Sequence, residues 1–212
     1  MTIIEFHASL HDISFDLRAK INLVIHLIAV YQGRELRDSG EPVLEHPCDV
    51  MRQLMDMDMP DDVIIAGGLH DMIEDTSMTF EILAQLFGTV VATRIMAVSK
   101  KDKIIFASKE ERLSEMHARW IIEAIKDFYI IFLKIADRLH NLVTLHGLER
   151  KDPSKVERIA IETLEFYVPF IRGQAREIVP PEYHHYLEKY ADKMEFLARN
   201  SLINVHVHHA PA

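Results

Sequence analysis

The stretch GGLHDMIEDT, residues 67–76, gathers four ionisable side chains, those of His70, Asp71, Glu74 and Asp75. On a helix, residues four apart share a face, so His70 would lie beside Glu74 and Asp71 beside Asp75. Carboxylates crowded onto one turn repel one another unless a cation lies between them. The pattern therefore predicts a divalent metal ion at His70 and Asp71.

Two adjacent residues cannot complete a coordination shell, so other ligands must come from distant segments. His46, in LEHP, and Asp137, in KIADRLHN, are the candidates. Two imidazoles and two carboxylates suit Mn²⁺, with Fe²⁺, Zn²⁺ or Ni²⁺ as alternatives. Open positions would let the metal acidify a bound water. Taken singly, His46 is more often a cap or a core histidine, and Asp137 an ion-pair partner of Arg138 or Lys134.

Helical periodicity dominates the segments that must position these residues. The β-branched run YIIFLKI has strand-like composition, but it continues into ADRLHNL at helical spacing, which favours a helix. We predict an all-α bundle in a single domain over residues 1–212, with a core of about 14–175, a C-terminal helix of about 181–199 and then a frayed tail. The helical segments are residues 14–33, 47–57, 59–75, 77–88, 89–100, 108–127, 128–145, 152–178 and 180–200.

The composition is that of an ordinary globular protein, with 49% hydrophobic residues and a formal net charge of −9. An acidic chain argues against non-specific binding to nucleic acid or anionic membranes. The single cysteine, Cys48, indicates a reducing compartment, and we expect a cytoplasmic protein. The N-terminal segment has no basic n-region, so it does not read as a signal peptide.

Five pieces carry a resemblance to a known family: RDSGEPVLEHP, AGGLHDMIEDT, FGTVVATRIMAVSK, LKIADRLHNLVTL and KVERIAIETLEFYVPF. They resemble the HD-domain metallophosphohydrolases, and within them the hydrolase domain of the RelA/SpoT family, which degrades the stringent-response alarmone (p)ppGpp. The pieces span about residues 30–170. The chain ends before the synthetase and regulatory domains of the long members. It thus resembles the small alarmone hydrolases, the group that includes the metazoan SpoT homologue.

The resemblance implies roles for individual residues. The family's metal ligands fall on His46, His70, Asp71 and Asp137, and the metal is usually Mn²⁺. The catalytic acidic pair falls on Glu74 and Asp75. The family's contacts to the nucleotide fall on Arg37, Ser39, Asn141 and Thr144.

The expected activity is that of a guanosine-3′,5′-bis(diphosphate) 3′-diphosphatase, acting on (p)ppGpp or (p)ppApp. Val43 and Val143 replace an aromatic residue and an arginine of the family pattern, and these changes affect the nucleotide environment. The alternatives are an HD phosphohydrolase of NADPH, a deoxynucleotide or a cyclic nucleotide, and a non-catalytic nucleotide sensor. The expected partner is a small nucleotide, and the sequence leaves room for a homo-oligomer. Lys100, Lys101 and Lys103 either attract the 5′ phosphates or form a solvated turn.

Overall fold

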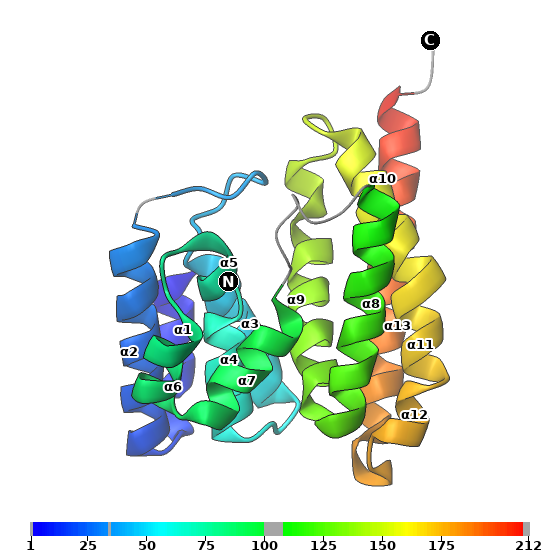
Figure 1. The fold of residues 1–212 in the computed structure, drawn as a ribbon. Helices are drawn as coiled ribbons and strands as arrows, with labels where there is room; N and C mark the ends of the chain where they lie inside the picture. The colour runs from blue at the N-terminus through cyan, green and yellow to red at the C-terminus, as the bar shows by residue number, and fades with distance from the viewer. Residues whose placement is uncertain (1, 34, 100–107, 210–212) are drawn as a thin grey trace. The chain divides into compact units, whose positions relative to one another are not determined.

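The computed structural model describes residues 2–33, 35–99 and 108–209 (Figure 1). Within these ranges the regular elements are helices, and an isolated antiparallel bridge joins Leu36 and Pro42. The all-α prediction is confirmed. The lysine cluster at residues 100–103 lies outside the described residues.

The chain divides into two compact units. Unit 1 comprises Met1–Glu35 and Val43–Lys134, and unit 2 comprises Leu36–Pro42 and Ile135–Ala212. The boundary falls inside helix α9 (Tyr129–Thr144), which begins in unit 1 and ends in unit 2. The single-domain organisation stays a prediction.

Unit 1 is built around α4 (Asp61–Leu69), whose residues from Val63 to Leu69 are all buried. A helix that is apolar on every side must be surrounded by other elements. Helices α2, α3 and α7 pack against α4. The elements of unit 1 other than α4 and the start of α9 are α1 (Ile3–Ser9), η1 (Leu10–Asp12), α2 (Phe15–Tyr31), α3 (Glu45–Asp56), α5 (Met72–Asp75), α6 (Phe80–Phe87), α7 (Thr89–Val98) and α8 (Lys109–Lys126).

Several predicted helix ends are confirmed by their caps. The Ser14 and Ser108 hydroxyls accept hydrogen bonds from the backbone N–H groups of the first turns of α2 and α8. Gly88 ends α6 with a φ of 92°, a conformation that suits glycine. Helix α3 begins at Glu45, two residues before the predicted start at Pro47. A proline is tolerated there because the first-turn N–H groups have no partner within the helix.

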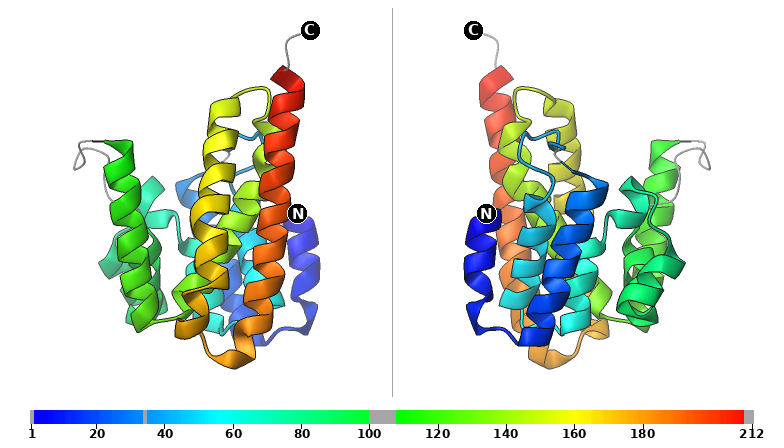
Figure 2. Two further views of the ribbon diagram at one scale, coloured as in Figure 1. Left: turned by 90° about the vertical axis from the view of Figure 1, so that its right-hand side faces the viewer. Right: turned by 90° about the vertical axis from the view of Figure 1, so that its left-hand side faces the viewer.

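In unit 2, α13 (His184–His209) packs along α10 (Pro153–Glu162) and α11 (Val168–Arg172), as Figure 2 shows. The short elements of this unit are η3 (Leu145–Gly147), η4 (Thr163–Tyr167), α12 (Ala175–Ile178) and η5 (Pro181–Tyr183). Within the described residues, no helix combines the length and the apolar character needed to cross a bilayer.

Two predicted helices of unit 2 need correction. The segment 152–178 is not one regular helix, because η4 is a π-helical turn between α10 and α11, and the helix then ends at Arg172, before α12. Pro169 follows this turn, and a proline removes a helical N–H and clashes with the carbonyl of the preceding turn. Helix α13 continues to His209 rather than ending near residue 199. Buried Val205 and the hydrogen bond from Asn204 Nδ2 to Glu149 Oε1, at 2.9 Å, hold this extension.

Candidate metal centre and nucleotide-binding residues

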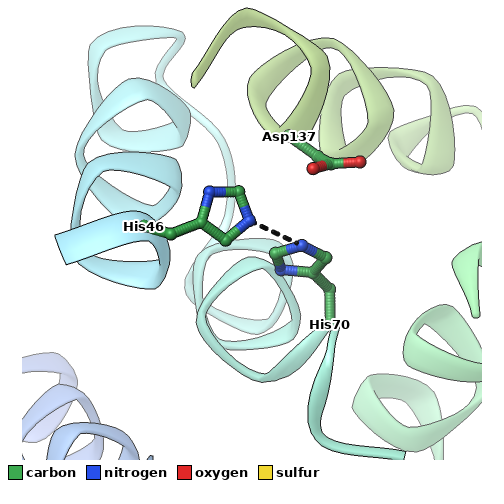
Figure 3. A group of neighbouring side chains, drawn as sticks. All are labelled: His46, His70 and Asp137. Atoms are coloured by element: carbon green, nitrogen blue, oxygen red, sulfur yellow. Dashed lines mark hydrogen bonds between the residues drawn. The ribbon is translucent and has the colours of Figure 1, made fainter. Parts of the chain in front are cut away.

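Three predicted metal ligands meet within unit 1. The Nε2 atoms of His46 and His70 are 3.1 Å apart (Figure 3). The Asp71 Oδ2 atom lies 3.4 Å from His46 Nε2 and 3.2 Å from His70 Nε2. These residues come from three elements, the first turn of α3, the C-cap of α4 and the N-cap of α5. Two imidazole nitrogens and a carboxylate oxygen that converge in this way are a donor set that could hold a metal ion.

The close approach of α3 to α4 depends on two glycines in α4. A Cβ atom at Gly67 would overlap the Leu54 Cδ1 atom, and one at Gly68 would lie 2.6 Å from the Met51 Sδ atom. Larger residues would require the Leu54 or Met51 side chain to shift, or α3 to move away from α4. The role of these glycines was not predicted, although the pair GG directly before LHD was the available signal.

A backbone hydrogen bond fixes the orientation of His70. Its Nδ1 atom lies 2.7 Å from the carbonyl oxygen of Gly67. A carbonyl only accepts, so Nδ1 carries the proton and, in the neutral ring, the Nε2 atom presents a lone pair. Ligand histidines in metal sites are commonly held by such a bond. The donor set therefore fits a divalent metal ion.

The environment of Asp71 favours its ionised form. Burial by itself raises the pKa of this carboxyl, but the charge of a protonated His70 and the hydrogen bonds from His46 and His70 outweigh burial, so the pKa lies well below its usual range. An ionised carboxylate beside two imidazoles is the state that a cation needs.

The structure corrects the expected helix over residues 59–75. Helix α4 ends at Leu69, and α5 begins only at Met72. The backbone N–H groups of Glu74 and Asp75 both donate to the Asp71 carbonyl, each at 3.0 Å. Glu74 is half-buried and Asp75 is exposed. The acidic pair therefore follows the ligand turn directly, but not as one face of a continuous helix.

Predicted site residues also meet within unit 2. The guanidinium of Arg37 donates through Nη2 to Asn141 Oδ1, at 2.8 Å. The Asn141 Nδ2 atom donates to Asp137 Oδ1, at 2.7 Å. Asp137 is the third side chain that Figure 3 draws, a buried carboxylate on α9 that offers a metal ligand atom. Three residues predicted separately thus form one hydrogen-bonded chain.

The other two predicted nucleotide contacts are placed differently. The Thr144 hydroxyl donates back into its own helix, to the carbonyl of His140 at 3.1 Å. The Ser39 carbonyl packs so closely on Gly147 that a Cβ atom there would overlap its oxygen. Ser39 therefore contacts η3, the turn that follows α9, through its backbone.

Arg138, which with Lys134 was one of two candidate ion-pair partners of Asp137, has its short ion pair with another carboxylate. Arg138 Nη2 pairs with Glu162 Oε1, at 2.9 Å, and its guanidinium lies over the Tyr167 ring. Burial alone lowers the pKa of Arg138, but the neighbouring Tyr167 phenol and Glu162 carboxylate raise it above its usual value. Arg138 is therefore a charged structural residue of unit 2.

The chain is similar in sequence to several known proteins. The HD domain family model matches residues 24–175. The bifunctional (p)ppGpp synthase/hydrolase SpoT of Escherichia coli K12 is 42% identical over 135 residues, which cover 64% of this chain and 19% of that protein. The guanosine-3′,5′-bis(diphosphate) 3′-pyrophosphohydrolase of Haemophilus influenzae is 39% identical over 135 residues, covering 64% of this chain and 20% of its own length.

Among solved structures, the crystal structure of lmo0812 from Listeria monocytogenes EGD-e aligns with a TM-score of 0.52 and 26% identity. The alignment covers 75% of this chain and 99% of that chain. The matched region spans about a fifth of the length of the two curated relatives.

Proposed function

Because this chain belongs to the HD-domain family, we propose that it is a metal-dependent 3′-pyrophosphohydrolase of the alarmones (p)ppGpp or (p)ppApp. The reaction releases pyrophosphate and a 5′-nucleotide. The observation that carries the proposal is the convergence of His46 Nε2, His70 Nε2 and Asp71 Oδ2, separated by 3.1 to 3.4 Å. The names of the two curated relatives, one a (p)ppGpp hydrolase and the other a guanosine-3′,5′-bis(diphosphate) 3′-pyrophosphohydrolase, support the substrate class.

The proposed metal ligands are His46, His70, Asp71 and Asp137, and the proposed metal is Mn²⁺. The mixed nitrogen and oxygen donors support a first-row divalent ion. The hydrogen bond from His70 Nδ1 to Gly67 and the one from Asn141 to Asp137 support the assignment, because outer partners of this kind orient metal ligands. When bound, such an ion neutralises phosphate charge and acidifies water.

The remaining chemistry belongs to the acidic pair and the loop. Glu74, half-buried directly after the ligand turn, accepts the proton of the water that attacks the 3′-proximal phosphorus. Asp75 orients that water. Arg37 and Ser39, with Asn141 and Thr144, contact the nucleotide.

The test measures alarmone hydrolysis by the full chain, first after its metal has been removed with a chelator and then after Mn²⁺ has been added back. We expect pyrophosphate release from ppGpp or ppApp that requires the metal. Glu74→Gln and Asp75→Asn should each lower turnover by about 10²-fold or more, the usual contribution of general acid–base catalysis. The matched control Glu177→Gln, at an exposed glutamate of α12, should retain full turnover. Unchanged turnover in both acidic variants would contradict the assigned chemistry.

The same assay separates the alternatives. NADPH is tested beside the alarmones, and phosphate release from deoxynucleoside monophosphates would favour another HD phosphohydrolase. Nucleotide binding without turnover of any substrate would favour a sensor. The net charge of −9 supports a small-molecule partner over nucleic acid. The cytoplasmic location and a homo-oligomer stay predictions.

A further inference from the structure

We propose that Arg37 and Asn141 are positioning residues for Asp137, so that the 36–42 loop (Leu36–Pro42) controls how well the chain binds its metal ion. We call the Arg37–Asn141–Asp137 chain of hydrogen bonds the relay. The inference rests on the proposed metal site, and it concerns residues of unit 2 only.

The chemistry of the Asn141 amide gives the relay its direction. The amide oxygen accepts from a guanidinium at 2.8 Å, and the amide NH₂ donates to a carboxylate at 2.7 Å. A flipped amide would place its oxygen against the carboxylate and its NH₂ against the guanidinium, so only one orientation satisfies both partners. Charged partners at both ends polarise the amide and strengthen both hydrogen bonds.

The bond from Asn141 occupies one oxygen of Asp137. It restrains the plane of the carboxylate whose oxygens are the proposed metal ligand atoms. Asp137 is only 8% exposed, so there is little competition from water for this geometry. Without the amide, the carboxylate can rotate away from the orientation that the metal requires.

The 36–42 loop holds Arg37 in place from its own side. The backbone N–H of Arg37 donates to the Glu41 carbonyl, and that of Gly40 donates to the Arg37 carbonyl, both at 2.9 Å. Gly40 has a φ of 104°, which closes the turn. The Glu41 carboxylate lies 3.2 Å from Arg37 Nε, so the guanidinium is held by Glu41 as well as by Asn141.

The loop is also fastened to the rest of unit 2. Lys155 Nζ pairs with Asp38 Oδ2 at 2.5 Å, and Lys151 Nζ donates to the Asp38 carbonyl at 3.0 Å. The close contact between the Ser39 carbonyl and Gly147 allows no side chain at residue 147. The position of Arg37 therefore depends on the whole loop. A movement of the loop would weaken the hydrogen bond that Arg37 donates to the Asn141 amide oxygen.

A nucleotide that draws Arg37 away from Asn141 would alter the orientation of Asp137. Coupling between two binding events is reciprocal, so metal binding would in turn change nucleotide affinity. The relay thus links the loop to the metal ligand without any contact between Arg37 and the ion.

The test is calorimetric titration of the chelator-stripped full chain with Mn²⁺, without substrate. Asn141→Ala should raise the Kd for Mn²⁺ by about 10- to 100-fold, the usual cost of losing an outer partner of a ligand. Arg37→Gln should raise it by about threefold or more. The matched control Arg150→Gln, at an exposed arginine, should leave it unchanged.

The double variant is decisive, because coupled residues give non-additive effects. If the relay is correct, Arg37→Gln causes no further loss in the Asn141→Ala background. Equal losses in both backgrounds, or an unchanged Kd in Asn141→Ala, would overturn it. Should Asn141→Ala fail to fold by circular dichroism, Asn141→Ser replaces it, because serine is too short to reach both partners. If the two substitutions affect the Kd for Mn²⁺ non-additively but the chain does not hydrolyse alarmones, the proposed function is refuted and the relay stands.

Discussion

The buried ion pair between Arg138 and Glu162 offers a direct test of what holds unit 2 together. The two side chains are 9% and 7% exposed, and their charged atoms are 2.9 Å apart. The Arg138 guanidinium also lies 4.2 Å from the centroid of the buried Tyr167 ring. Replacing Glu162 by alanine would leave a guanidinium buried and without its carboxylate.

The expected loss can be estimated from this burial. Removing one partner of a buried ion pair costs about 3–5 kcal/mol, whereas an exposed pair contributes only about 0–1 kcal/mol. A domain has a free energy of unfolding of about 5–15 kcal/mol in all, so Glu162→Ala should remove a large fraction of it. Glu162→Gln keeps the shape and an acceptor, and should cost about 1.5–3 kcal/mol.

Equilibrium unfolding in urea, followed by circular dichroism, measures both losses. With a urea slope of about 2 kcal/mol per molar, Glu162→Ala should lower the midpoint by about 1.5–2.5 M. The control is Glu165→Ala, which removes an exposed glutamate three residues later. A Glu162→Ala loss of less than about 1 kcal/mol, equal to that of the control, would show that the pair is solvated and that the reasoning from burial is wrong.

Three further predictions follow from close packing and burial. Gly147→Ala places a Cβ atom against the Ser39 carbonyl, so we expect the free energy of unfolding in urea to fall by about 1–3 kcal/mol. The amide hydrogens of the 36–42 loop should also exchange faster with solvent. Unchanged exchange would contradict the contact. Gly67→Ala gains about 1 kcal/mol of helix propensity, but its methyl group overlaps buried Leu54 on α3, the helix that carries His46. Calorimetry should therefore show weaker Mn²⁺ binding. An unchanged Kd would show that α3 tolerates the methyl group. Burial raises the pKa of Cys48 to about 12 from its ordinary 9.0. A disulfide reagent at about pH 8 should therefore react slowly with the native chain and rapidly in urea, and stability should fall as the pH rises from 9.0 towards 12, because only the unfolded thiol ionises there.

The fold was predictable where apolar periodicity and caps agree. The segment 14–33 became α2, which begins after a Ser14 cap, and YIIFLKI became part of α9 because its apolar residues continue at helical spacing. The interruptions were not predictable in the same way. The π-helical turn at Thr163–Tyr167 and the break between Leu69 and Met72 are local departures inside segments whose average pattern is helical. A pattern averaged over many residues does not report a change in a single turn.

The chemistry of the site was readable from residue types. His46, His70 and Asp71 were chosen because imidazoles and carboxylates are metal ligands, and the structure brings these three together. The glycines that allow this meeting, Gly67 and Gly68, were missed because their role depends on a neighbouring helix.

Residue types and local spacing were enough to predict the candidate metal ligands and most of the helical segments, because both follow from side-chain chemistry along a short stretch of chain. The side-chain partners came instead from the packing of distant segments, as Arg37 with Asn141, 104 residues away, and Arg138 with Glu162 show. Periodicity specifies the face of a helix on which a residue lies, whereas the packing of other elements determines which side chain it meets there.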